Sequence, residues 1–217
     1  MSIYTQDSLS LTKLALNSLL LRSMARVYPQ TSSSSPSPYI SLKPESFTIW
    51  MKSLVFNTHG CTVYDSKGDI VYRVDNYDNK CGQEVYLMDI RGKVLFSIQQ
   101  KTKFRLFGCC DGYKWDDCSS EKELWFRVRK HRSVCVNSCD HKARGCAYRI
   151  VRMDGKSEFK IVDEDQEGAV IAEIKQKQTT TGINFGNDVF TLTVQPNIDH
   201  SLIMAIVMVY GLINNQI

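Results

Sequence analysis

From residue 47 onward, apolar and polar residues alternate in short runs that are separated by turn residues. An alternation with a period of two is typical of β-strands that bury one face. The first unit of this kind is a run at 61–64, a turn at 65–68 and a second run at 70–74. Gly68 can adopt the positive φ that a tight reversal needs. The pattern therefore predicts a β-hairpin at this point.

The same unit recurs along the chain, with further reversals at 89–92, 153–155 and 165–168. The pattern predicts strands at 50–56, 61–64, 70–74, 85–88, 94–98, 102–107, 124–128, near 134, and at 148–152, 157–161, 169–174 and 189–194. About a dozen strands suit a closed barrel or a large sandwich.

The last apolar run has a different character. Pro196 ends the final strand because it cannot donate a ladder hydrogen bond, and Asp199 is a good N-cap residue for a helix over 202–213. These residues would rise only about 18 Å as a helix, whereas the hydrocarbon core of a bilayer is about 30 Å thick. We therefore expect no transmembrane span. A helix that is apolar on every face must be surrounded by protein, and an enclosing β-barrel would do this.

The first 45 residues are different in composition. They are rich in Leu, Ser and Thr, and the run at 31–38 is too poor in apolar residues to fold. We predict a disordered leader at 1–45 and one mainly β domain at 46–217. Lys13, Arg22 and Arg26 favour an organellar targeting segment, but the leucines do not gather on one helical face. The other explanation is an upstream extension before a natural start at Met24, so that residues 1–23 need not belong to the natural protein.

Composition excludes several classes of function. A net charge of +4 is too small to indicate nucleic-acid binding. The chain has eight cysteines but no recognisable signal peptide, so we expect reduced thiols in the cytoplasm rather than a disulfide framework. No nucleotide, metal or other cofactor is expected.

Several of these segments resemble the LURP-one-related proteins of plants. They are Trp50–Phe56, Gly60–Asp65, Tyr72–Tyr77, Leu87–Gly92 and Asp199–Ala205. The resemblance covers residues 46–217 and implies a tubby-like fold, in which a twelve-stranded antiparallel barrel encloses a hydrophobic C-terminal helix, related also to phospholipid scramblases. Met24–Pro29 resembles a family N-terminus, which favours the upstream extension. The resemblance is absent from two segments that we expect to be loops, 108–122 and 130–145.

For function, the resemblance implies plant defence for some members and, by analogy with tubby proteins, tethering to membranes through phosphoinositides. Cations that could bind such headgroups alternate with apolar residues in two runs. Lys101, Lys103 and Arg105 would share one face of a strand, and Arg127 and Arg129 repeat the arrangement. Clustered cations suit anionic headgroups. The plainer interpretation is that they keep an outer barrel face solvated or protect an edge strand.

Other polar residues give weaker signals. Cys135, Cys139, His141 and Cys146 do not have the spacing of a standard zinc site, nor do Cys109, Cys110 and Cys118. Asp116 and Asp117 are expected in a solvated turn, His59 at a hairpin turn and His200 in the first turn of the last helix. No catalytic motif gives any of them a partner.

The sequence thus predicts a monomeric, non-enzymatic binding module in the cytoplasm, at the inner face of the plasma membrane if its ligand is anionic phospholipid. The alternative is a scaffold that binds another protein and has no affinity for lipid. A small-molecule carrier is disfavoured because the helix would fill the lumen of the barrel.

Overall fold

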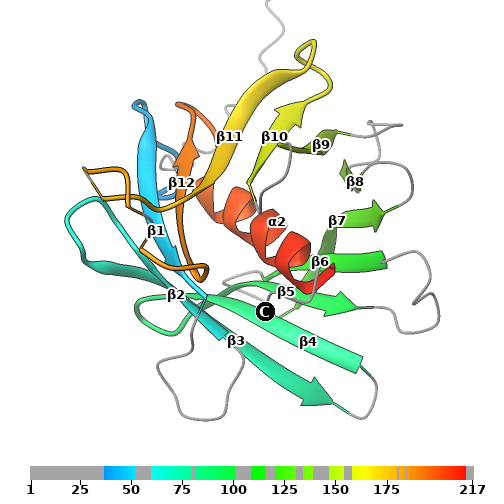
Figure 1. Cartoon of the computed structure of the whole chain (residues 1–217). Coiled ribbons are helices and arrows are strands. Elements are labelled where there is room, and N and C mark those ends of the chain that lie inside the picture. Colours follow the sequence, from blue (N-terminus) through cyan, green and yellow to red (C-terminus); the bar gives the residue numbers. More distant parts are fainter. Residues whose placement is uncertain are drawn as a thin grey trace, which may run out of the picture. The chain divides into compact units, whose positions relative to one another are not determined.

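The computed structural model describes residues 37–51, 60–79, 82–100, 109–115, 121–130, 134–138, 147–153, 158–179, 181–183 and 185–213. From Pro38 onward, they belong to one compact unit. Within it, twelve antiparallel strands close into a barrel around a helix (Figure 1). The predicted fold class is confirmed.

The strands follow one another around the barrel in chain order. They are β1 (Glu45–Trp50), β2 (Gly60–Tyr64), β3 (Ile70–Asn79), β4 (Gly82–Asp89), β5 (Val94–Gln100), β6 (Cys109–Trp115), β7 (Lys122–Lys130), β8 (Val134–Ser138), β9 (Tyr148–Arg152), β10 (Phe159–Asp163), β11 (Ala169–Gln176) and β12 (Val189–Val194). β1 pairs with both β2 and β12, which closes the ring. Closure leaves no edge strand among these twelve.

The helix α2 (His200–Ile213) lies inside the ring of strands (Figure 1). Every residue from Ile203 to Leu212 is buried, so the helix has no solvent-facing side over that length. Tyr210 packs its ring on that of Phe159 on β10, with centroids 4.1 Å apart. No helix among the described residues has the length and apolar character needed to cross a membrane.

The predicted N-cap is also confirmed. Asp199 Oδ1 accepts hydrogen bonds from the Ser201 amide at 2.9 Å, the Ser201 hydroxyl at 2.6 Å and the Leu202 amide at 3.2 Å. Just before β1, the Tyr39 carbonyl accepts a hydrogen bond from the His200 amide. The Ser41 carbonyl accepts one from the Asn197 amide. Residues before the predicted domain start at 46 thus pack against the turn that leads into α2.

The structure differs from the sequence prediction at the first strand and in the two segments that were expected to be loops. The first strand begins at Glu45, with Phe47 and Ile49 buried, and ends at Trp50, whereas residues 52–56 of the predicted run lie outside the described residues. The expectations of loops over 108–122 and 130–145 are wrong where Cys109–Trp115 form β6 and Val134–Ser138 form β8, the latter as the strand predicted near 134 required. The predicted strand at 102–107 lies outside the described residues.

Candidate functional site

The cations predicted to bind lipid headgroups divide into two groups. Lys101, Lys103 and Arg105 lie outside the described residues. Arg127 and Arg129 lie on β7, where the alternate residues Phe126 and Val128 are buried in the core. The predicted alternation on this strand is therefore confirmed, with both arginines on the outer face of the barrel.

Arg127 is bound to a buried carboxylate. Its partner Asp111 lies directly opposite on β6 and is fully buried. Arg127 Nε donates to Asp111 Oδ1 at 2.6 Å and an Nη donates to Oδ2 at 3.0 Å. This two-pronged, charge-assisted pairing is among the strongest that side chains make. Arg127 thus neutralises Asp111 and holds β6 to β7.

Arg129 is in a different setting. It is exposed, it has neither an ion pair nor a hydrogen bond from its side chain within the described part of the chain, and Cys135 faces it on β8. Arg149 on β9 is in register with Cys135, so the two arginines flank that thiol in one outward row. Lys130 and Arg152 are also exposed, at the same end of their strands, but by alternation they share the side of the buried residues Val128 and Ile150 and so lie at the end of the barrel and not in the outward row.

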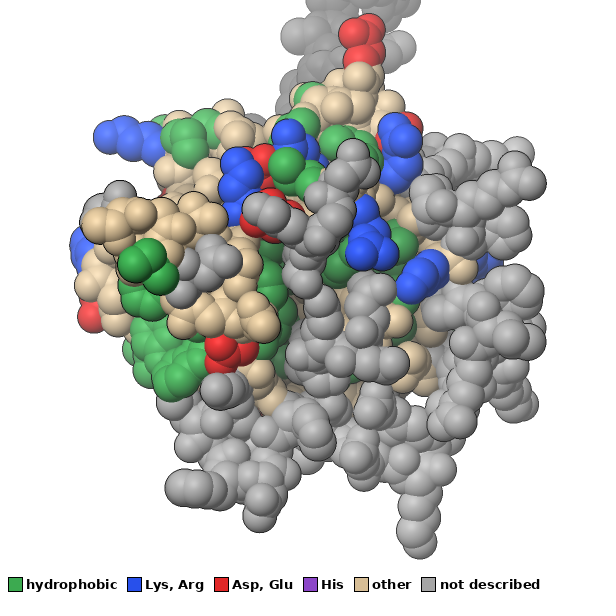
Figure 2. Space-filling model, viewed as in Figure 1, with side chains coloured by type: hydrophobic (Ala, Val, Ile, Leu, Met, Phe, Trp, Pro, Cys, Tyr) green, Lys and Arg blue, Asp and Glu red, His purple; other side chains and the backbone are tan. Residues whose placement is uncertain are grey.

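We refer to Arg129, Lys130, Arg149 and Arg152 as the basic face. The carboxylates that lie nearest in register are already engaged. Arg149 Nε donates to Glu164 Oε1 at 2.6 Å, and Glu158 Oε1 accepts from the Gln176 amide at 3.4 Å. In the view of Figure 2, Lys and Arg side chains are interspersed with apolar and acidic ones instead of forming a continuous sheet. The positive charge visible in this view is therefore not continuous.

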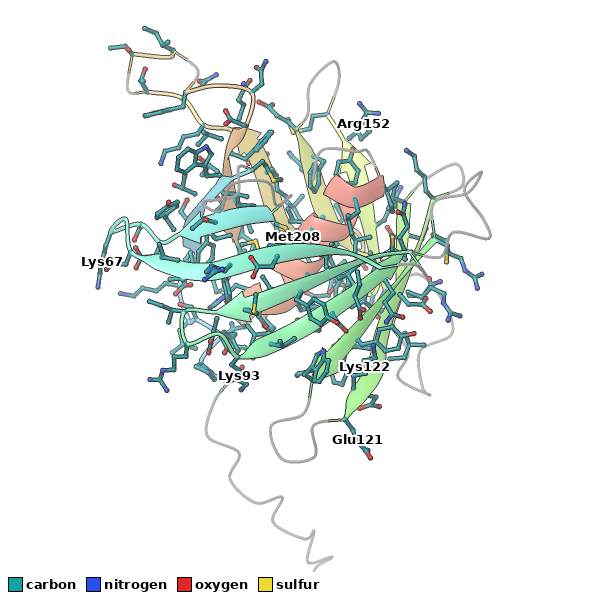
Figure 3. The ribbon with its side chains drawn as sticks, turned by 90° about the horizontal axis from the view of Figure 1, so that it is seen from below. Lys67, Lys93, Glu121, Lys122, Arg152 and Met208 are labelled. Carbon is teal, nitrogen blue, oxygen red and sulfur yellow. The ribbon has the colours of Figure 1, made fainter. Side chains whose placement is uncertain are left out.

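A second feature, which the sequence analysis missed, is an open groove at the end of the barrel where α2 begins. Its volume is about 830 Å³. The segment before β1 and the turns β2–β3 and β4–β5 form its walls, and Phe47, Tyr72 and His200 line its floor. We call it the helix-start groove. Figure 3 shows Lys67, at its rim, on one side of the barrel and Arg152 on the other.

The floor of the groove contains a polar cluster. The Tyr72 hydroxyl lies 2.5 Å from His200 Nδ1, and Glu45 Oε2 lies 3.5 Å from His200 Nε2. Burial lowers the pKa of His200, against the opposing effect of Glu45 and Asp199, and burial raises the pKa of Tyr72. At neutral pH the phenol therefore donates to Nδ1, and Nε2 carries its hydrogen toward the Glu45 carboxylate, which can only accept.

The cysteines that the structure describes are free thiols. Cys61 and Cys110 are buried, and burial raises the pKa of each to about 12. Cys109 and Cys135 are partly exposed. Among the described residues, no three His, Cys, Asp or Glu side chains lie close enough to hold a metal ion. His59, Asp116, Asp117, Cys118, Cys139, His141 and Cys146 lie outside that part of the chain.

These features define an antiparallel β-barrel protein built around a central apolar helix, with cations gathered at the ends of β7 and β9 and a groove where the helix begins. The profile of the LURP-one-related family matches residues 45–211, and the chain belongs to that family. The protein LURP-one-related 11 of Arabidopsis thaliana is 41% identical over 210 residues, which cover 88% of this chain and 89% of that protein. LURP-one-related 4 of the same plant is 46% identical over 196 residues, with 88% and 87% covered.

An X-ray structure of an Arabidopsis thaliana protein has the same fold, with a TM-score of 0.59 and 17% identity over 81% of this chain and 94% of that chain. The LURP-one-related family is not a known enzyme family.

Proposed function

We propose that this protein is a non-enzymatic module that binds anionic phospholipid headgroups through the basic face. The observation that carries the proposal is Arg129, an exposed guanidinium without a partner in the described part of the chain, in register with Cys135 and, beyond it, Arg149. A guanidinium presents a planar fork of donors that matches phosphate oxygens.

The number of cations sets the expected strength. A basic residue near an anionic membrane contributes about 1 kcal/mol, so Arg129 and Arg152, whose side chains make no ion pair among the described residues, give about 2 kcal/mol, or roughly thirtyfold in affinity. Such binding is reversible and weakens as salt screens the charges. Lys101, Lys103 and Arg105 follow β5 directly in the chain and are proposed as further headgroup ligands. Arg127 supports the face through Asp111 without contacting lipid.

In a plant cell, this activity would hold the protein at the inner face of a membrane. Membership of the LURP-one-related family suggests that it acts in a defence-related process.

Sedimentation with vesicles tests the proposal. Phosphatidylcholine vesicles with and without phosphatidylserine or a phosphoinositide are compared at physiological salt, using the full chain. We expect binding to anionic vesicles only, and a loss of at least tenfold in the double variant Arg129→Glu with Arg152→Glu. The matched control is Lys67→Glu with Arg91→Glu, which reverses two cations of the helix-start groove. Equal loss in both variants, or no binding of the wild type to anionic vesicles, would refute the proposal.

A further inference from the structure

The loop between β11 and β12 exposes two large apolar side chains. Ile183 is 66% exposed and Phe185 is 58% exposed. Both belong to the parts of this loop that the structure describes, which are 177–179, 181–183 and 185–188. Between Lys177 and Asp188 the sequence of the loop contains no charged residue. The tip of the loop therefore combines apolar side chains with uncharged polar ones.

Hydrogen bonds within the loop fix the positions of these two residues. The Thr179 amide donates to the Ile183 carbonyl at 2.7 Å, and the Ile183 amide donates to Thr179 Oγ1 at 3.0 Å. The Phe185 amide donates to the Lys177 carbonyl at 2.9 Å. The loop thus presents Ile183 and Phe185 in a defined conformation, so a contact through them does not need the loop to become ordered first.

The two charged residues that bound the loop are bonded to the barrel wall. Lys177 Nζ donates to Thr48 Oγ1 at 2.7 Å and lies 5.6 Å from the centroid of the Phe185 ring. Asp188 Oδ2 accepts a hydrogen bond from Trp50 Nε1 at 3.2 Å. Transfer of the tip out of water would therefore not carry an unpaired carboxylate with it, which removes the largest cost of such a transfer.

The loop leaves the barrel at the end where β9 finishes with Arg152. Arg152 is in register with Phe159 on β10, and Phe159 is in register with Ile174, two residues before β11 ends. Arg152 is thus two strand spacings, about 10 Å, from Ile174. Figure 3 shows Arg152 and the loop, in faint orange, on the side of the barrel away from Lys93 and Glu121. The apolar tip and cations of the basic face therefore lie at the same end of the barrel.

We propose that the β11–β12 loop inserts Ile183 and Phe185 into the interfacial layer of the anionic membrane that the basic face binds. This inference rests on the proposed lipid binding, because the cations would bring the loop to the bilayer. Attraction by two unpaired cations is weak and is screened by salt, whereas burial of apolar side chains adds a contribution that salt does not screen. Exposed apolar side chains also serve as protein contacts, and the experiments below separate the two uses.

Sedimentation with phosphatidylcholine vesicles that contain phosphatidylserine tests the insertion. We expect Ile183→Ser with Phe185→Ser to bind at least tenfold more weakly than the wild type at physiological salt. The loss should be the same at every salt concentration, because no charge is changed. The variant Arg129→Glu with Arg152→Glu should instead reduce the dependence of binding on salt.

A matched control uses two exposed apolar residues from the other end of the barrel. Leu42 is 84% exposed and Ile90 is 68% exposed. The variant Leu42→Ser with Ile90→Ser removes two side chains of similar size and should bind the vesicles as the wild type does. Thermal melting checks that each variant is folded, which is expected because the changed side chains are exposed.

Fluorescence quenching gives a direct measure of depth. Phe185→Trp adds an indole at the tip, and Ile90→Trp adds one at the other end. With brominated phosphatidylcholine in the anionic vesicles, we expect the emission that Phe185→Trp adds to the wild-type signal to be quenched. The emission that Ile90→Trp adds should not change.

The outcomes distinguish failure of the insertion from failure of the basic face. If the wild type does not bind anionic vesicles, the proposed lipid binding is wrong and the insertion falls with it. If the wild type binds and the Ile183 and Phe185 variant binds equally well, only the insertion is wrong, and these side chains are left for a protein contact. Equal losses in the loop variant and the Leu42 and Ile90 control, or no quenching of Phe185→Trp, would also overturn the insertion.

Discussion

Arg127 and Asp111 face each other across β6 and β7 and are joined by two side-by-side hydrogen bonds, of 2.6 and 3.0 Å. Asp111 is buried although it lies on the outer side of the barrel, so its charge depends on the guanidinium for compensation. The alternation of Arg127 with apolar neighbours indicated that it binds lipid. In the structure, Arg127 instead holds the neighbouring strands β6 and β7 together.

Replacing Arg127 should destabilise the protein, because a buried carboxylate without its partner costs several kcal/mol. We expect Arg127→Leu to lower the free energy of unfolding by about 3 kcal/mol in urea titrations. Arg129 lies two residues further along β7. Arg129→Leu should change the free energy of unfolding by no more than about 0.5 kcal/mol. The double variant Arg127→Leu with Asp111→Leu should recover most of the loss, and its failure to do so would show that the pair is not the cause.

Gly112 is required by the close approach of an aromatic ring. A Cβ atom at this position would lie 2.2 Å from Phe126 Cζ, and Phe126 is buried. Gly112→Ala should therefore lower the free energy of unfolding by about 2 kcal/mol through overpacking. In a Phe126→Leu background the same change should cost clearly less, since the ring that it meets is gone. Equal costs in both backgrounds would contradict this explanation.

The pKa of His200 gives stability a defined pH dependence. Burial lowers this pKa below its unfolded value of about 6.5, so the unfolded chain binds more protons just below that pH. The stability that the neutral His200 imidazole contributes is fully present above about pH 6.5. It is lost as the pH falls toward the pKa that His200 has in the folded protein. The difference in unfolding free energy between wild type and His200→Gln should therefore shrink as pH falls from neutral. A difference that grows on acidification would mean that Glu45 outweighs burial.

The described thiols should differ in reactivity. Burial raises the pKa of Cys61 and Cys110 to about 12, so almost no thiolate is present at neutral pH. Iodoacetamide should leave both unmodified in the folded protein while the partly exposed Cys135 reacts, as judged by peptide mass mapping. All three should react in denaturant. Modification of Cys61 as fast as Cys135 would show that the barrel opens readily.

Features that depend on local chemistry could be predicted from the sequence. Gly68 and Gly92 adopt φ of 90° and 80°, as their turns required. The alternating run 189–194 has the bounds of β12, and Asp199 caps a helix that is buried on all sides. Each turn, strand and helix cap depends on residues that are neighbours in the chain. A helix that is apolar on every face must be enclosed because water does not solvate apolar side chains favourably.

Features that depend on residues from distant strands could not be predicted. Asp111 and Gly112 are poor strand formers, but across the sheet Asp111 pairs with Arg127, and Gly112 leaves room for the ring of Phe126.

The sequence by itself determined that a chain of hairpins surrounds an apolar helix, because alternation, turn residues and capping act within a few residues. Only the tertiary structure decided which cations are available, by burying Asp111 beside Arg127 and leaving Arg129 exposed. It also brought Lys43, Lys67 and Ile90 to one groove, because barrel closure brings together segments that the chain keeps apart.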